Sequence, residues 1–174
     1  MGSSTVDITF GPDGAWRGAL ATPHPAGDPA HGNRGAVVIV HEWWGLNDHI
    51  RSIAARWADA GFLALAIDAY DGVVARDRDH ARALMNGLDK ARAVKLIADA
   101  VAHVRALPGS SGKVALTGYC LGGALTIAAA AQVRDLACAV PFYGITAVNA
   151  DAISAPVLAH FCAADDWATP AAAQ

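Results

Sequence analysis

Five short runs of almost continuously apolar residues constrain this fold more than any other feature of the chain. They read AVVIV (36–40), FLALAI (62–67), KVALT (113–117), CAVPF (138–142) and PVLAHF (156–161). Apolar runs without polar alternation are typical of strands that are covered on both faces, as in a parallel sheet. The sequence therefore predicts an α/β protein with a mostly parallel sheet and helices on both of its faces.

Helical patterns separate these runs. Asn47 or Asp48 is placed to cap a helix that runs to about Ala60 and stops at Gly61. Between the second and third runs, apolar residues recur every three or four positions and so share one helix face: Val94, Ile97, Val101 and Val104. Strands that alternate with helices favour right-handed crossovers between parallel strands.

The N-terminal part has a different pattern. VDITF (6–10), the turn GPDG (11–14) and AWRGAL (15–20) predict a β-hairpin, and the Pro- and Gly-rich stretch 22–35 predicts a surface loop. The sequence shows no internal repeat, no low-complexity tract and no second domain. We therefore expect residues 1–174 to form a single domain.

Composition and charge exclude several classes of protein. The net charge of −3 lacks the basic excess that nucleic-acid binding requires. The start MGSSTV carries neither an export signal nor a myristoylation pattern, and the apolar stretches are far shorter than the roughly 20 residues that span a membrane. The 3 cysteines are odd in number and far apart, which predicts no disulfide framework and favours the cytoplasm.

Ionisable and polar side chains follow each of the five runs. In parallel sheets ligands bind at the carboxyl ends of the strands, so these side chains are expected to gather on one rim. They are His41 and Glu42 after the first run, Asp68, Cys120 and Tyr143 after the next three, and Asp165 and Asp166 after the last.

The stretch GYCLGG (118–123) has the form of a sharp turn from a strand into a helix. Such a turn strains its central residue and needs small neighbours, here Gly118 and Gly122. Cys120 would project above the sheet at the start of the helix, where the helix dipole and free N–H groups favour a thiolate. The N–H of Leu121 would then point to where an oxyanion forms. The alternative is a buried cysteine that packs as a small hydrophobe.

Three blocks of the chain resemble the dienelactone hydrolases of the α/β-hydrolase superfamily, and they occur in the family's order. They are HEWWGLNDHIR (41–51), GYCLGGAL (118–125) and PVLAHFCAADDWATP (156–170). The first two blocks are specific and the third is looser. The resemblance extends from about Val6 to the last residue and implies an α/β-hydrolase fold.

The resemblance also implies a Cys-His-Asp triad with Cys120 as the nucleophile. The acid falls on Asp166, which stands four residues before Pro170 as in the family's Asp-x-x-x-Pro pattern, and Asp165 is the alternative. Glu42 matches the family's glutamate that faces the resting thiol and takes part in activating it.

Further residues complete the implied site. The backbone N–H groups of Trp43 and Leu121 match the family's oxyanion hole, and Arg78 matches an arginine that receives the carboxylate of the substrate. Tyr143 is expected to line the pocket. No metal or organic cofactor is implied, because no His, Cys and carboxylate spacing resembles a ligand set.

The chain departs from the family at the triad histidine. In the family this histidine lies downstream of the acid, after one more strand, whereas the last histidine here is His160. His41 is the nearest substitute, but neighbouring strand residues point to opposite faces, so His41 and Glu42 cannot both face the site. We expect a domain that lacks its last strand and helix at the C-terminus, and a chain that is weakly active or inactive.

The sequence thus predicts a cysteine-dependent hydrolase of small lactones or esters, similar to carboxymethylenebutenolidase. A non-catalytic small-molecule-binding relative of the same fold is the main alternative. A thiol redox or peroxide sensor is disfavoured because the chain has no Cys-x-x-Cys, and a serine-type esterase because cysteine holds the nucleophile position. The oligomeric state stays open.

Overall fold

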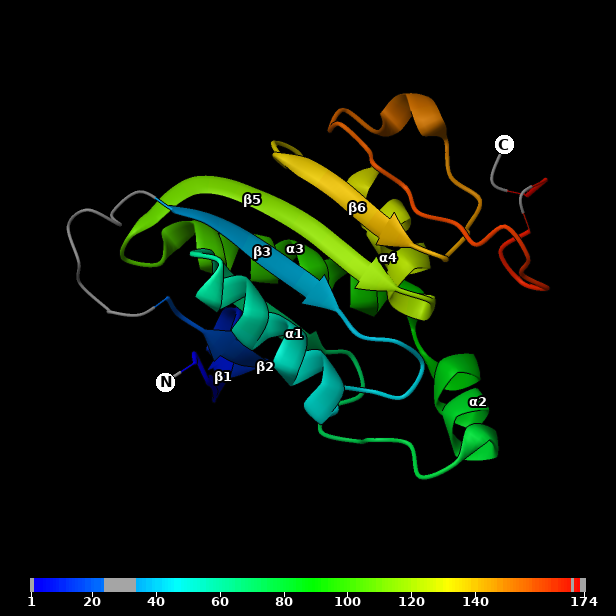
Figure 1. The fold of residues 1–174 in the computed structure, drawn as a ribbon, viewed down its shortest axis with the longest axis horizontal. Coiled ribbons are helices and arrows are strands. Elements are labelled where there is room, and N and C mark those ends of the chain that lie inside the picture. Colours follow the sequence, from blue (N-terminus) through cyan, green and yellow to red (C-terminus); the bar gives the residue numbers. More distant parts are fainter. Residues whose placement is uncertain (1, 24–33, 170, 173–174) are drawn as a thin grey trace.

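A computed structural model describes residues 2–23, 34–169 and 171–172 of the chain. Its centre is a 6-stranded sheet with the order β1-β2-β4-β3-β5-β6 (Figure 1). The strands are β1 (Thr5–Phe10), β2 (Trp16–Ala21), β3 (Arg34–Val40), β4 (Leu63–Asp68), β5 (Ser110–Tyr119) and β6 (Cys138–Phe142). Strands β4, β3, β5 and β6 run parallel, as their apolar runs predict.

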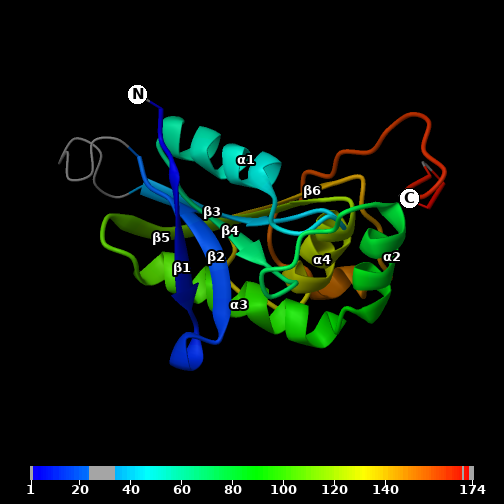
Figure 2. The same ribbon diagram turned by 90° about the horizontal axis from the view of Figure 1, so that it is seen from below.

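Helices cover both faces of the sheet, which confirms the predicted α/β arrangement. They are α1 (Asp48–Asp59), α2 (Arg78–Gly87), α3 (Lys90–Ala106) and α4 (Leu121–Ala130), with short 3-10 turns at Pro12–Gly14 and Ala150–Ala152. Figure 2 shows α1 on one side of the strands and α3 and α4 on the other. Each side has its own apolar core, so the central strands are buried on both faces.

The predicted helix signals are confirmed. Asn47 caps α1 by accepting a hydrogen bond from the backbone N–H of Ile50 at 3.1 Å, and Gly61 lies just beyond the helix with a φ of 98°. The apolar face predicted for the later helix belongs to α3, where its members are all buried: Val94, Ile97, Val101 and Val104.

The N-terminal hairpin also forms as predicted and joins the parallel sheet at one edge. Strands β1 and β2 pair antiparallel from Thr5 with Ala21 to Phe10 with Trp16, and β2 pairs antiparallel with β4. Trp16 fixes the hairpin to α3, because its indole N–H donates to Asp99 at 2.6 Å and the Arg92 guanidinium lies 4.8 Å from its ring. Most of the expected loop, residues 24–33, lies outside the described residues.

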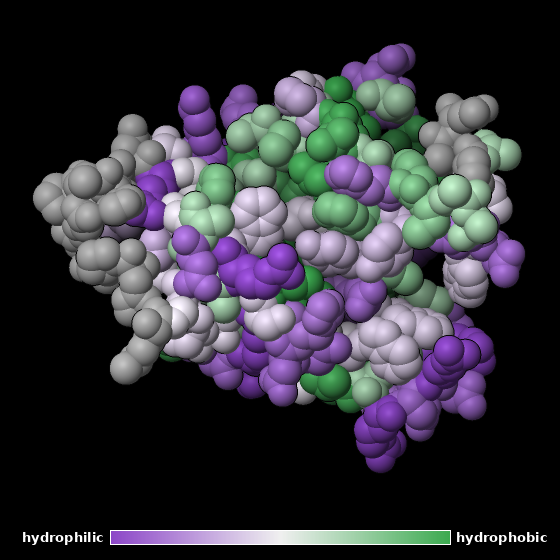
Figure 3. Space-filling view, in the orientation of Figure 1, coloured by the Kyte–Doolittle hydropathy of each residue, from purple (hydrophilic) through white to green (hydrophobic). Residues whose placement is uncertain are grey.

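The fifth apolar run does not form the predicted buried strand. Residues 156–161 make only isolated parallel bridges to β6, between Ala139 and Val157 and between Phe142 and His160. Val157 is 48% exposed and Leu158 is 61% exposed. In the part of the chain that the structure describes, no element covers the outer side of this run. Figure 3 shows hydrophobic side chains gathered at this edge, around β6 and the segment that follows it.

Candidate active site

Cys120 occupies the junction between β5 and α4. Its backbone has a φ of 54° and a ψ of −115°, in a region that non-glycine residues rarely adopt. Its N–H donates to Phe142 O at 3.0 Å, and its carbonyl accepts from the N–H of Ala124 at 3.1 Å. These bonds tie the turn to the end of β6 and to the first turn of α4. The strained strand-to-helix turn predicted from GYCLGG is therefore present.

Glycines around this turn allow the backbones to pack closely. A Cβ on Gly118 would lie 2.2 Å from Gly122 O, and a Cβ on Gly122 would lie 2.3 Å from Val40 O. Both positions exclude any side chain, as the sequence predicts. Gly144, which the sequence analysis did not single out, has the same role, because its Cβ would lie 2.3 Å from Cys120 O.

The surroundings of Cys120 keep its sulfur protonated at rest. Burial raises the pKa of the thiol, the N–H of Leu121 lowers it, and the nearby carboxylates of Glu42 and Asp165 raise it further. The net shift is upward from the ordinary value. The N–H at the helix start lowers the pKa of the thiol, as expected, but desolvation and two carboxylates outweigh it in the resting site.

A cavity of about 940 Å³ opens over Cys120. Trp43, Leu121 and Tyr143 line it together with Cys120, so the residues predicted to supply the nucleophile, the oxyanion hole and the pocket wall share one space. The N–H of Leu121 acts on the Cys120 sulfur and lowers the pKa of the thiol. The remaining lining residues are largely apolar and come from the end of α2, the start of α3, α4, the segment 144–147 and, near the C-terminus, Asp165, Trp167, Ala168 and Ala172.

Glu42 and Tyr143 form a pair beside the thiol. The Tyr143 hydroxyl donates to Glu42 Oε1 at 2.9 Å. Burial and the hydrogen bond to Glu42 raise the pKa of Tyr143 well above its ordinary value near 10, so the phenol remains a donor. Glu42 also acts electrostatically on Cys120. Glu42 therefore lies near Cys120, and its part in activating the thiol stays a prediction.

The two aspartates of the third block lie in different places. Asp165 lines the Cys120 cavity, and its Oδ1 accepts from the N–H groups of Trp167 at 2.7 Å and Ala168 at 3.1 Å. Asp166 is exposed; it lines a neighbouring depression together with Asp165, but it is not among the residues that line the Cys120 cavity. Of the two carboxylates, the one brought to Cys120 is the alternative, Asp165.

The cation at the cavity is also not the predicted one. Arg78 begins α2 and is exposed, and the cavity lining does not include it. The other end of α2 reaches the cavity through Met85 and Asn86, and Lys90, an exposed residue at the start of α3, is the cationic residue among those that line the cavity. Sequence reasoning missed Lys90 because nothing local distinguishes it from a solvated helix residue.

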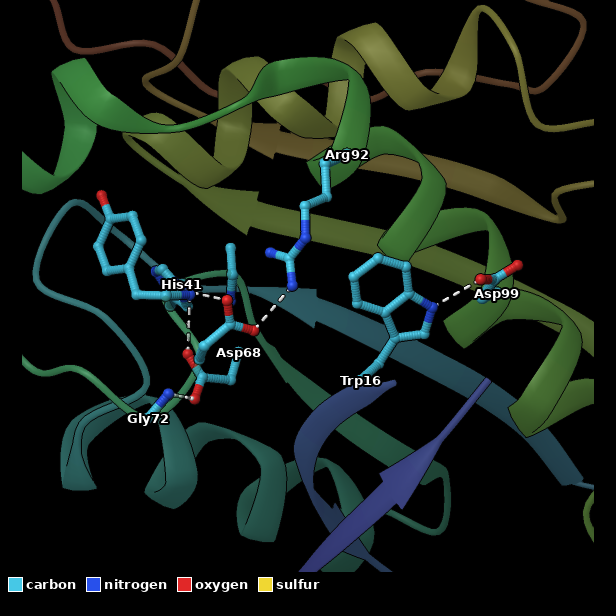
Figure 4. Close-up of polar contacts among 9 residues, drawn as sticks. Trp16, His41, Asp68, Gly72, Arg92 and Asp99 are labelled. Atoms are coloured by element: carbon cyan, nitrogen blue, oxygen red, sulfur yellow. Dashed lines mark hydrogen bonds and ion pairs between the residues drawn. The ribbon is translucent and has the colours of Figure 1, made fainter. Parts of the chain in front are cut away.

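His41 is fully buried, and both of its ring nitrogens form hydrogen bonds with the backbone. Its Nε2 accepts from the N–H of Ala69 at 3.1 Å, so Nδ1 carries the proton and lies 2.5 Å from Glu42 O. Burial lowers the pKa of the imidazole, which stays neutral. Asp68 has a similar role and accepts from the N–H groups of Tyr70 at 2.9 Å and Gly72 at 2.5 Å (Figure 4). His41 thus has no free nitrogen with which to act as a base.

The described residues show neither a metal-binding cluster nor a membrane-spanning helix. Residues 2–23, 34–169 and 171–172 contain no cluster of three or more His, Cys, Asp or Glu side chains that could hold a metal ion. Among the same residues, no helix has the length and apolar character needed to cross a membrane. No histidine of the described chain lines the Cys120 cavity.

Comparison with known proteins decides the family. The dienelactone hydrolase family model matches residues 17–174. This chain belongs to the dienelactone hydrolase family. Protein usf of Aquifex pyrophilus is 37% identical over 87% of the chain and 67% of its own length. Carboxymethylenebutenolidase 1 of Cupriavidus pinatubonensis is 33% identical over 97% of the chain and 75% of its own length.

Solved structures agree with this assignment. A dienelactone hydrolase-like promiscuous phosphotriesterase, P91 from metagenomic libraries, superimposes with a TM-score of 0.85 at 28% identity, covering 99% of this chain and 74% of its own. A protein from Klebsiella pneumoniae described as a dienelactone hydrolase superimposes with a TM-score of 0.76 at 22% identity. This family member is therefore a hydrolase with the α/β-hydrolase fold, as its sequence predicts.

Proposed function

We propose that this dienelactone hydrolase family member cleaves small lactones or esters by acyl transfer to the Cys120 thiol. One observation carries the proposal: Cys120 stands at a strained strand-to-helix turn, under a largely apolar cavity of about 940 Å³, with the N–H of Leu121 at its sulfur. The carboxymethylenebutenolidases among its relatives support the substrate class.

The reaction begins with the substrate carbonyl oxygen placed toward the N–H groups of Trp43 and Leu121. The thiol proton passes to Glu42, the sulfur attacks the carbonyl carbon, and the carbonyl π electrons move to the oxygen. When the oxygen reforms its double bond, the C–O bond of the ring or ester breaks and the leaving oxygen takes up a proton. The product is a thioester on Cys120.

Release of the acyl group needs a base that activates water. In the family pattern this base is a histidine that an aspartate orients. The Asp-x-x-x-Pro spacing favours Asp166 as that aspartate, whereas the residues that line the cavity favour Asp165. The described residues place no histidine at the cavity. We therefore infer that the 174-residue chain acylates slowly and then stalls as the thioester.

A nitrophenyl ester tests this proposal. The purified chain is expected to release about one equivalent of nitrophenol in a burst, followed by a steady rate orders of magnitude below that of a carboxymethylenebutenolidase with an intact triad. Mass spectrometry of the digested protein should place the acyl group on the peptide that contains Cys120, and not on Cys138 or Cys162. An acyl group on Cys162 would overturn the assignment. Ester binding without any adduct would favour the non-catalytic relative, and fast continuous turnover would contradict the stalled thioester.

The cation that receives an acidic substrate is the next testable feature. Lys90 lines the cavity and Arg78 does not, so Lys90→Met should slow acylation by a negatively charged ester about 5-fold, as expected for one partly solvated charge. Arg78→Met should change it by less than about 2-fold. Acylation by a neutral ester is the control and should stay constant in both variants. The reverse order of effects would restore the role that the family resemblance gives to Arg78.

A further inference from the structure

Tyr70 is a buried side chain whose hydroxyl is unsatisfied. The residue is only 7% exposed, and within the described residues its hydroxyl oxygen has no hydrogen-bond partner. The ring is held in place, because it packs 4.9 Å from the ring of His41 and a Cβ on Gly45 would lie 3.3 Å from its Cδ2. Native proteins rarely leave a buried hydroxyl without a partner, so this one calls for an explanation.

Tyr70 and Cys120 both follow strands that end at the carboxyl edge of the sheet. Val40 of β3 pairs with Ile67 of β4 on one side and with Gly118 of β5 on the other. Tyr70 follows Ile67 by three residues, and Cys120 follows Gly118 by two. Because neighbouring strands lie about 4.8 Å apart, Ile67 and Gly118 are separated by roughly 10 Å, and Tyr70 and Cys120 lie in the turns that directly follow these two strands.

Tyr70 also lies on the same face of the sheet as the helix that begins after Cys120. It belongs to the apolar cluster that includes Leu125 of α4. The Tyr70 hydroxyl and the Cys120 thiol interact electrostatically, since burial and a charge on Cys120 together raise the pKa of Tyr70 to about 12. The phenol therefore keeps its proton throughout the pH range in which a thiol ionises.

We propose that the Tyr70 hydroxyl donates a hydrogen bond to the Cys120 sulfur when the thiol ionises. The hydroxyl has no partner in the resting protein and gains one only with the thiolate, so it selectively stabilises the reactive form. This hydrogen bond offsets the effect of the Glu42 and Asp165 carboxylates, which oppose ionisation of the Cys120 thiol. The inference rests on the proposed function only in taking Cys120 as the nucleophile.

The test is the pH profile of Cys120 alkylation by iodoacetamide, followed on the Cys120 peptide by mass spectrometry. Tyr70→Phe removes only the hydroxyl and should raise the apparent pKa of Cys120 by about one to two units. At neutral pH the alkylation rate should fall about 10-fold or more. Thermal stability should not fall, because the lost hydroxyl has no partner in the resting protein.

Tyr119→Phe is the matched control. Tyr119 directly precedes Cys120 but stacks on Phe142 and packs against the core on the α1 side of the sheet. The alkylation profile of Cys120 in Tyr119→Phe should therefore overlay that of the wild type. A Tyr70→Phe profile that overlays the wild type would overturn the inference, as would a loss of thermal stability with an unshifted profile. Alkylation needs no ester cleavage, so a shifted profile without an acylation burst would leave this inference standing while the proposed function fails.

Discussion

Gly122→Ala should destabilise the fold by roughly 3 kcal/mol or more and dismantle the turn that carries Cys120. The added Cβ would lie 2.3 Å from Val40 O and 2.6 Å from His41 O. Both atoms belong to the backbone at the end of β3, so no side-chain rotation can make room. Helix α4 and strand β3 would have to separate, although alanine by itself favours a helix over glycine by about 1 kcal/mol.

Gly87→Ala provides the matched control for this prediction. Gly87 is the last residue of α2, and a Cβ there would meet nothing within 4 Å. The change should be neutral or stabilising by up to about 1 kcal/mol. Urea unfolding of both variants, followed by circular dichroism, measures the difference. Equal unfolding midpoints for Gly122→Ala and Gly87→Ala would show that α4 does not pack on β3 as closely as described.

Cys120→Ser should abolish the acylation burst, with a loss of at least about 10³-fold in the rate of acylation. Serine has nearly the same shape as cysteine, so the fold should be retained. Its hydroxyl ionises far less readily than a thiol, and no histidine of the described residues lines the cavity to remove its proton. Stopped-flow measurement of nitrophenol release provides the rate.

The pH dependence of the wild-type burst provides a second readout of the same group. The thiolate is the nucleophile, and burial with two carboxylates raises the pKa of Cys120 above its ordinary value near 9. The burst rate should therefore continue to increase as the pH rises into the alkaline range. Cys162→Ser removes an exposed thiol and should leave both the burst and its pH profile unchanged. A burst that persists in Cys120→Ser would instead indicate a serine-type esterase or another nucleophile.

Sequence reasoning succeeded where short-range patterns decide the structure. The apolar runs placed β3, β4, β5 and β6, and helical periodicity placed α3. The spacing of Gly118 and Gly122 around Cys120 predicted a tight turn, because backbones that pack this closely leave no room for a Cβ. Each of these features follows from the chemistry of a few adjacent residues.

Sequence reasoning was incomplete where distant segments decide the environment. The run at 156–161 is as apolar as a central strand but lies beside β6 without cover, so Val157 and Leu158 stay exposed. The family spacing indicated Asp166, whereas the fold of the segment brings Asp165 to the cavity. Likewise, the direction of α2 turns Arg78 away and leaves Lys90 at the cavity.

By itself, the sequence determined the sheet, its helices and the glycine-flanked turn that presents Cys120, since apolar periodicity and steric exclusion act locally. Only the tertiary structure decided the protonation of that thiol and its neighbours. The pKa of Cys120 depends on burial and on Glu42 and Asp165, which approach from other parts of the chain. The unpartnered hydroxyl of Tyr70 became visible for the same reason, because desolvation and Coulomb interactions depend on distances in space.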